Sequence, residues 1–207
     1  MIEVTRFDGW IAGIGSAAGL RCVVGHWPVS TLGSFTDVMV ERPDGERILL
    51  APSAAVAEFV AATYRFDDVM TVPVNLDRSR DRWALEAGPL DLTIEVGRRQ
   101  PLGYLLRAVP RPLATATGWI SMVDHIARRV LPGVRTVGST GNHRREYYAA
   151  LDLHRITSAS VQWDGLDQGR LAPVHPPVRF GFGSTPRRPS LAQVVTLVRD
   201  EPCRAPE

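Results

Sequence analysis

Residues 90–96 read Leu90-Asp91-Leu92-Thr93-Ile94-Glu95-Val96, with an apolar side chain at every second position. In an extended chain successive side chains point to opposite faces, so the apolar residues share one face and the polar residues the other. Such alternation is typical of an antiparallel strand with one buried and one wet face. Residues 70–76 alternate in the same way, with Pro73 predicted at a sheet edge. The stretch therefore predicts a β-rich fold.

A hairpin is predicted nearer the N-terminus. Residues 35–41 and 46–50 flank Pro43-Asp44-Gly45. Proline presets φ for a turn, and glycine accepts the positive φ of its last position. Two further strands are expected at 145–153 and 158–163, and another at 103–108, followed by a loop at 109–117. Residues 190–200 fit either a strand or a capped helix.

Two segments change to a helical period. In residues 53–64, Ser53 can cap a helix whose buried stripe includes Val56 and Val60. In residues 119–131, a stripe from Trp119 to Val130 is expected to be buried, with Asp124 on the polar face beside Arg128. The predicted fold class is α+β: a largely antiparallel sheet, barrel-like or a sandwich, with these two helices packed on it. Residues 1–200 are expected to form a single globular domain and 201–207 a flexible tail.

All 24 basic residues are arginine, so the chain contains no lysine. This excludes mechanisms that need an ε-amine: Schiff bases, the phosphate-binding lysine of P-loops and the kinase strand lysine. The net charge of +2 is small, and the arginines are interspersed with 22 acidic residues, so nucleic-acid binding is not expected. No apolar run is long enough to span a membrane, and a cytoplasmic location is expected.

The two cysteines indicate neither a disulfide framework nor a zinc site, and no cofactor or metal is expected. Cys22 lies in an apolar run and is predicted to belong to the core, whereas Cys203 falls in the C-terminal tail.

Two glycine-containing segments are candidate anion-binding loops. Each combines hydroxyl groups with arginines: Ser139, Thr140, His143, Arg144 and Arg145 in the first, and Ser184, Thr185, Arg187 and Arg188 in the second. Glycines let backbone amides turn toward a ligand, and arginine binds carboxylate or phosphate with two parallel hydrogen bonds. Together the segments predict one anion pocket. The alternative is that they are ordinary polar loops.

The predicted strand at 145–153 suggests acid–base chemistry. Regular alternation would place Glu146, Asp152 and His154 on one face, with apolar residues on the other. A carboxylate two positions from a histidine can orient its imidazole. These three residues are therefore catalytic candidates if that face lines a cavity. If it meets water, they form an ordinary solvated strand surface.

A β-rich chain of this length is similar to acetoacetate decarboxylase-like folds, whose catalytic group is a lysine. Because this chain has none, no family is assigned from the sequence. The first functional hypothesis is a protein that binds a small anionic ligand, a carboxylate or phosphate with an apolar body, in a β-rich cavity. The alternatives are a lysine-independent enzyme that uses Glu, Asp and His, or a protein–protein interaction module. The sequence does not decide among these three functions, and it does not give the oligomeric state.

Overall fold

The computed structural model describes residues 4–130, 136–140, 144–181 and 185–200, with the backbone alone at 125–130, 139, 140, 144 and 200. The predicted tail, 201–207, and Cys203 within it lie outside these residues. The strands are β1 Val4–Ser16, β2 Arg21–Ser30, β3 Phe35–Glu41, β4 Arg47–Ala51, β5 Asp68–Thr71, β6 Val74–Arg78, β7 Arg82–Ala87, β8 Leu90–Arg99, β9 Val137–Thr140, β10 Arg144–Trp163, β11 Leu166–Asp167, β12 Leu171–Ala172 and β13 Ser190–Asp200. The helices are α1 Ala54–Thr63, α2 Pro101–Ala108, α3 Arg111–Ala114 and α4 Thr117–Val130.

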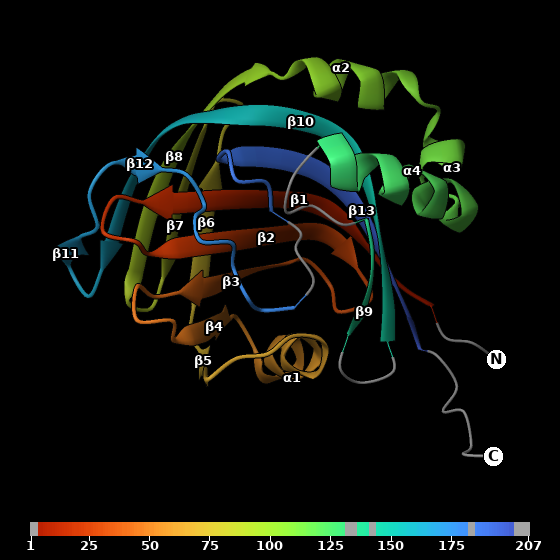
Figure 1. Ribbon diagram of the computed structural model, residues 1–207. Helices are drawn as coiled ribbons and strands as arrows, with labels where there is room; N and C mark the ends of the chain where they lie inside the picture. Colours follow the sequence, from red (N-terminus) through yellow and green to blue (C-terminus); the bar gives the residue numbers. More distant parts are fainter. Residues whose placement is uncertain (1–3, 131–135, 141–143, 182–184, 201–207) are drawn as a thin grey trace.

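Within the described residues, 13 strands form a single sheet whose main path is β5-β4-β3-β2-β1-β13-β10-β8-β7-β6. The sheet curls into a half-barrel (Figure 1). Its pairs are antiparallel except for β4 with β5, which run parallel, so the sheet is mixed rather than purely antiparallel. The helix between β4 and β5, α1, makes this parallel crossover possible.

The two edge strands, β5 and β6, are separated in sequence by Val72 and Pro73 alone. The prediction of one strand at 70–76 is therefore wrong, because the chain leaves one edge of the sheet and enters the other at this point. Proline lacks the N–H that a continuing strand needs, which favours a break here.

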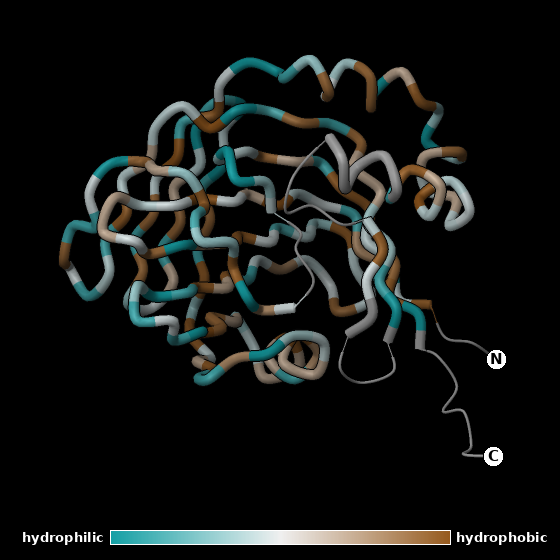
Figure 2. The backbone as a smooth tube through the Cα atoms, in the orientation of Figure 1, coloured by the Kyte–Doolittle hydropathy of each residue, from teal (hydrophilic) through white to brown (hydrophobic). Residues whose placement is uncertain are grey.

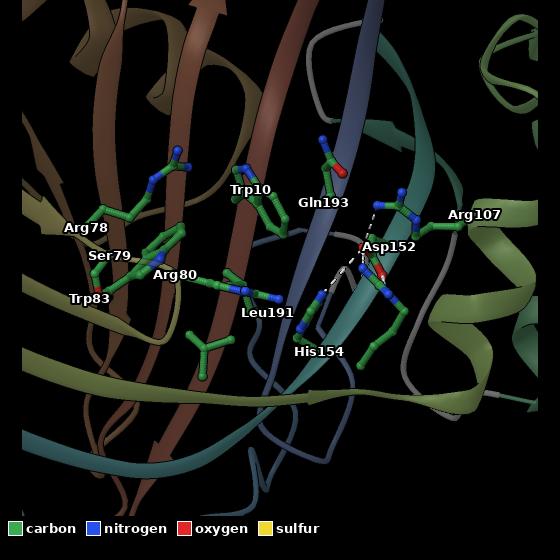
Figure 3. A pocket seen from close by; sticks show the side chains of 12 residues that line it. Trp10, Arg78, Ser79, Arg80, Trp83, Arg107, Asp152, His154, Leu191 and Gln193 are labelled. Atoms are coloured by element: carbon green, nitrogen blue, oxygen red, sulfur yellow. Dashed lines mark hydrogen bonds and ion pairs between the residues drawn. The ribbon is translucent and has the colours of Figure 1, made fainter.

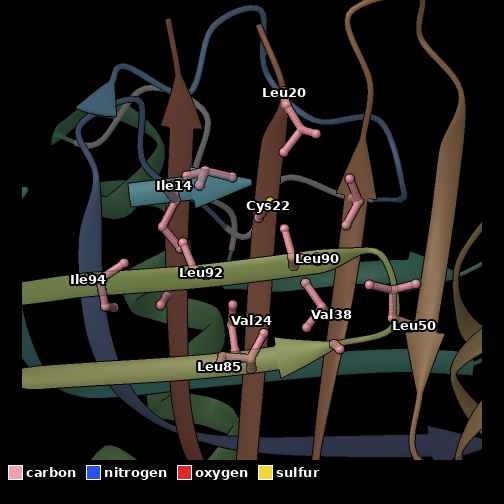
Figure 4. Close-up of a cluster of buried hydrophobic side chains, with 14 of the residues drawn as sticks. Ile14, Leu20, Cys22, Val24, Val38, Leu50, Leu85, Leu90, Leu92 and Ile94 are labelled. Atoms are coloured by element: carbon pink, nitrogen blue, oxygen red, sulfur yellow. The ribbon is translucent and has the colours of Figure 1, made fainter. Parts of the chain in front are cut away.

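The curl encloses the face of the sheet that we call the inner face. Strands β7 and β8 cross over β1, β2 and β3, and apolar side chains fill the space between them (Figure 4). Ile14, Cys22 and Val38 contribute from one side and Leu85 and Leu92 from the other. Strand β8 alternates hydrophobic and hydrophilic residues along its first half, and alternation of this kind is visible in several strands of Figure 2. Cys22 is a buried member of this core, as predicted, and burial raises the pKa of its thiol to about 12.

The opposite, outer face of β1 to β4 is covered by α1. Ser53 caps this helix by accepting a hydrogen bond from Val56 N, and Val56 and Val60 are buried against the sheet. The predicted helix at 53–64 is thus confirmed. The predicted hairpin between β3 and β4 is confirmed as well, with Gly45 at a φ of 95°. No described helix is both long and apolar enough to cross a membrane.

The region between β8 and α4 differs from prediction. Residues 103–108 were expected to form a strand and 109–117 a loop, but they contain α2 and α3. A short apolar run fits a strand or a buried helix equally well, and Pro101 at the first turn favours the helix. Gly103 lets α2 approach β10, because a Cβ there would lie 2.6 Å from Leu153 O and 2.9 Å from Asp152 Oδ1.

The predicted helix at 119–131 is present as α4, but its buried face is not the one expected. Ile120 and Asp124 are buried, whereas Trp119 and Val123 are half-buried. Asp124 accepts hydrogen bonds from Thr136 N at 2.7 Å and from Val137 N at 3.2 Å. This carboxylate therefore holds the start of β9 against the helix, and the prediction that it lies on the polar face is wrong.

Candidate functional site

Strand β10 is one continuous element, where two strands had been expected, and it contains an irregularity that decides where its side chains point. Ala150 pairs with Val194 of β13, and Asp152 pairs with the next residue, Gln193. Leu151 is thus an extra residue, a β-bulge. Because side chains alternate along a strand, one extra residue moves every following side chain to the other face.

The catalytic candidates consequently separate. Glu146 and Tyr148 point to the outer face, where both line a small cavity beneath α1. Asp152 and His154 point to the inner face, where they line a larger cavity. The expectation that Glu146, Asp152 and His154 share one face is wrong, since it assumed regular alternation through the bulge. Asp152 and His154 do lie together, with 3.4 Å between Asp152 Oδ2 and His154 Nε2.

The inner cavity has a volume of about 410 Å³. Its lining residues come from β1, β6, β7, β8, β10, β13, α2 and the turn after β6: Trp10, Arg78, Ser79, Arg80, Trp83, Val96, Arg99, Arg107, Asp152, His154, Leu191 and Gln193. In Figure 3, Arg107, Asp152 and His154 lie on one side, Arg78 and Trp83 on the other, and Trp10 between them. This volume is in the usual range for small-molecule sites.

A buried carboxylate anchors one side of the inner cavity. The side chain of Asp152 is 2% exposed and accepts two hydrogen bonds from Arg99, at 2.7 and 3.0 Å. Burial by itself would raise the pKa of Asp152, but the hydrogen bonds from Arg99 and from Leu153 N, with the nearby charges, outweigh it and lower that pKa. Asp152 is therefore a fixed negative charge within the cavity.

His154 is held in place by its surroundings. Its Nδ1 lies 3.3 Å from Gly97 O, its Nε2 faces Asp152, and its ring lies edge-on to Trp10 with 6.5 Å between the ring centroids. The side chain keeps 22% of its surface exposed. A histidine that is fixed by a carboxylate and still accessible from a cavity is suited to exchange protons with a bound molecule.

Arginine dominates the charge of the inner cavity. Four arginines and one carboxylate line it. Arg99 is engaged by Asp152, and Arg107 lies 3.6 Å from the same carboxylate. Arg78 lies over the ring of Trp83, with 5.8 Å from its Cζ to the ring centroid. Among the described residues, neither Arg78 nor Arg80 forms an ion pair. The cavity therefore has a surplus of positive charge.

The two predicted anion-binding segments lie apart. Ser139 and Thr140 belong to β9 and pair with Arg145 and Arg144 of β10, so the described residues of the first segment lie in paired strands rather than in a loop. Arg145 also pairs with Arg199, near the C-terminal end of β13. The second segment approaches the other end of β13, because Thr185 contacts Gly13, which pairs with Ser190. The described residues of the two segments therefore lie toward opposite ends of β13.

The individual residues of these segments differ in exposure. Arg145 is exposed and lies over the ring of Tyr147, Arg187 and Arg188 are exposed, and Thr185 is buried. His143 and Ser184 lie outside the described residues, as do the side chains of Ser139, Thr140 and Arg144. Ligand binding by this group of residues stays a prediction.

The residues that line the inner cavity were largely missed by the sequence analysis. Arg78 ends β6 and Arg80 lies in the turn after it, a stretch that reads as an ordinary charged connection. Arg99 ends β8, and Arg107 lies in the last turn of α2, a helix that was not expected. No spacing in the sequence links these arginines to Trp10 or Trp83, because only the curl of the sheet brings them together. Among the described residues, no cluster of three or more His, Cys, Asp or Glu side chains could hold a metal ion.

Comparison with known proteins gives a likeness in structure but none in sequence family. No family model and no curated protein matches the chain. A crystal structure of acetoacetate decarboxylase from Legionella pneumophila resembles it with a TM-score of 0.44 and 11% sequence identity, over 95% of this chain and 84% of that chain. A likeness of this size carries no argument about activity, so the candidate function below rests on the cavity itself.

Proposed function

We propose that the inner cavity binds a small organic anion, a carboxylate or phosphate with an apolar body. The observation that carries the proposal is the convergence of four arginines and a single carboxylate in one cavity of about 410 Å³. Charged side chains on a protein surface are usually solvated separately. Here the curled sheet and α2 bring Arg78, Arg80, Arg99 and Arg107 to the walls of one open cavity.

The charge pattern favours an anion over a neutral ligand. The negative charge of Asp152 neutralises the positive charge of Arg99, and two parallel hydrogen bonds hold the Arg99 guanidinium group in a fixed orientation. Arg78 and Arg80 form no ion pair among the described residues, so they are available to a ligand. Guanidinium groups bind carboxylate and phosphate oxygens in the same forked geometry, so these arginines can bind either type of anion.

The other lining groups suit an apolar body with one polar group. Trp10, Trp83, Val96 and Leu191 provide apolar surface, and the amide of Gln193 faces the same space (Figure 3). Aromatic walls with a few placed polar groups are the common composition of small-molecule sites. A flat ring that carries a carboxylate or phosphate is the simplest molecule with these features.

The test uses three aromatic probes of similar size: phenylacetate, phenyl phosphate and the neutral phenylacetamide. We expect the two anions to raise the melting temperature in a saturable way and the amide to have little effect. A ligand at 100 times its dissociation constant stabilises a protein by about 2.7 kcal/mol. The preference between the first two probes distinguishes carboxylate from phosphate.

Variants locate the binding. Arg80→Gln and Arg107→Gln should each weaken anion affinity about tenfold, which corresponds to ~1.4 kcal/mol. Arg187→Gln is the matched control, because Arg187 is exposed and does not line the cavity. Anion stabilisation that survives both cavity variants would contradict the proposal, and its loss in Arg187→Gln alone would favour the site expected from the sequence.

A second candidate function is acid–base catalysis in the same cavity. The observation that favours it is the contact of buried Asp152 with accessible His154. Asp152 would orient the imidazole, and His154 would remove a proton from a carbon next to the carbonyl of a bound anion. Glu146 has no part in this scheme, because it lies on the outer face.

Deuterium exchange tests this second candidate. Phenylpyruvate carries a carboxylate, an aromatic ring and exchangeable methylene protons, and its exchange in D₂O can be followed by NMR. If His154 is the base, His154→Gln should slow the protein-dependent exchange by about 10²-fold or more, whereas Glu86→Gln, at an exposed position, should not. Exchange that does not exceed the rate without protein would exclude the reaction while leaving anion binding intact.

A further inference from the structure

The inner cavity carries more positive charge than a single carboxylate neutralises. Four arginines and one carboxylate line it, which is a surplus of three positive charges when His154 is not counted. Asp81, in the turn beside Arg80, is not among the lining residues, and its carboxylate accepts a hydrogen bond from Ser79 Oγ at 3.1 Å. A ligand with one carboxylate therefore leaves most of the surplus in place.

The positive charge of the cavity is divided between two ends. At the first end, Arg107 lies 3.6 Å from Asp152. At the second end, Arg78 lies over the ring of Trp83. Figure 3 shows these two pairs on opposite sides of Trp10. We call them the Asp152 end and the Trp83 end.

Strand pairing gives the separation of the two ends along β8. Trp83 pairs with Ile94 of this strand. His154, at the Asp152 end, pairs with Arg99 of the same strand. Arg99 is the fifth residue after Ile94, which corresponds to about 16 Å along the strand at ~3.3 Å per residue. The two pairs of side chains therefore start from well-separated points of the wall.

The floor between the two ends is one row of paired residues. Trp10 pairs with His26 of β2 and with Gln193 of β13. Gln193 in turn pairs with Asp152 of β10. Neighbouring strands lie ~4.8 Å apart, so His26 and Asp152 are about 14 Å apart along the sheet. The ring of His26 lies edge-on to that of Trp83, with 5.7 Å between the centroids. Across the sheet as along β8, the two ends are too far apart for one carboxylate to contact both.

Arg78 is held in a position to bind an anion. Its Cζ lies 5.8 Å from the ring centroid of Trp83, and Trp83 is itself buried. His26 contacts the same ring, and its Nδ1 lies 2.9 Å from Thr36 Oγ1. Stacking uses the face of a guanidinium group, so the N–H donors along its edge can still bind a carboxylate. Within the part of the chain that the structure describes, Arg78 forms no ion pair.

We infer that the ligand of the inner cavity is a dianion such as a dicarboxylate, with one anionic group at the Asp152 end, the other bound by Arg78, and an apolar spacer between them. This inference rests on the proposed function and narrows the class of molecule. Trp10, Val96 and Leu191 line the cavity and provide apolar surface for the spacer. Two anionic groups neutralise two of the three surplus charges.

The test compares three probes by titration calorimetry at constant ionic strength. They are para-phenylenediacetate, its ortho isomer, and para-tolylacetate, which keeps the ring but has one carboxylate. We expect the para dianion to bind about tenfold more tightly than para-tolylacetate, because its second carboxylate reaches Arg78. The ortho isomer has the same charge with both carboxylates on one side of the ring, so it should gain little over para-tolylacetate.

A variant of Arg78 locates the second anionic group. Arg78→Gln should lower the affinity for para-phenylenediacetate about tenfold and leave that for para-tolylacetate unchanged, so the preference for the dianion disappears. Arg78 is exposed, so this variant is expected to fold. Arg82→Gln is the matched control, because it removes the same charge from an exposed position one residue before Trp83 and outside the cavity lining. This control should keep the preference.

Three results would overturn the inference: equal affinities for para-phenylenediacetate and para-tolylacetate, equal affinities for the two isomers, or a preference for the dianion that survives in Arg78→Gln. Loss of the preference in Arg82→Gln as well would indicate a general effect of charge and would also count against it. In each of these cases para-tolylacetate still binds, so the proposed function stands. If none of the three probes binds, the proposed function fails together with this inference.

Discussion

The two cavities of this protein share strand β10 but differ in charge, size and walls. The inner cavity of about 410 Å³ is lined by four arginines and two tryptophans, whereas the outer cavity of about 40 Å³ is lined by two carboxylates and six aromatic rings. Residues of β10 contribute to both, with Glu146 and Tyr148 on one face and Asp152 and His154 on the other. The comparison shows that one extra strand residue, Leu151, is enough to assign neighbouring titratable groups to separate chemical environments.

The largest effect is expected from inserting one alanine between Leu151 and Asp152. The insertion would shift the register of one half of β10, so that Asp152 and His154, or Glu146 and Tyr148, would face the wrong side. A buried carboxylate that loses its partner is strongly destabilising. We therefore expect loss of the cooperative thermal transition, measured by circular dichroism.

Deletion of Leu151 is the matched contrast. It removes the bulge but keeps Ala150 opposite Val194 and Asp152 opposite Gln193, so both faces retain their residues. Its cost should resemble the loss of one buried leucine, about 2–5 kcal/mol. If the deletion and the insertion destabilise the fold equally, the bulge does not separate the two cavities in the way described.

A second effect concerns the pH dependence of stability. Burial raises the pKa of Asp37 from 3.8 to about 7, against a smaller opposing effect of the Trp27 hydrogen bond. Between these values the native state holds a proton that the unfolded state has released, so stability falls as pH rises, by at most about 1.4 kcal/mol for each unit. The contribution is fully present below pH 4 and lost above pH 7.

Asp37→Asn should abolish this slope and make the protein more stable at pH 8, as measured by urea unfolding from pH 4 to pH 8. Asp91→Asn, at an exposed position of β8, should leave the slope unchanged. If the unfolding free energy of Asp37→Asn depends on pH with the same slope, then other groups whose pKa differs between the folded and unfolded states cause it.

A smaller effect is expected from Tyr64→Phe. The phenol donates to Glu146, which is 2% exposed, and its removal leaves that carboxylate with fewer donors. Loss of a partner to a buried polar group costs about 1–3 kcal/mol. Denaturant unfolding measures the change, and an unaltered midpoint would show that Tyr64 is not needed to stabilise Glu146.

The smallest effect tests the independence of the two cavities. Arg107→Gln should weaken phenylacetate binding about tenfold, whereas Asp37→Asn, in the outer cavity, should leave it unchanged. Both are read from thermal shifts at matched ionic strength. Equal losses in the two variants would indicate that the cavities are coupled.

Several features of the fold were predictable because they depend on neighbouring residues. The hairpin at Gly45, the helix capped by Ser53 and the strand at 90–96, which lies within β8, follow from turn geometry, capping and side-chain alternation. The burial of Cys22 follows from its apolar neighbours. Residues 190–200 remained ambiguous, because an apolar run of that length fits a strand or a helix, and pairing with both β1 and β10 made it a strand.

The sequence by itself determined a β-rich chain without lysine. Arginine therefore supplies all 24 of its permanently cationic side chains. Only the tertiary structure decided which arginines meet, since the curl of the sheet joins a turn after β6, the end of β8 and helix α2 around Asp152. It also decided the faces of Glu146, Asp152 and His154. Alternation is a local property of a strand, whereas a bulge depends on its pairing with a neighbouring strand, which the order of residues along β10 does not reveal.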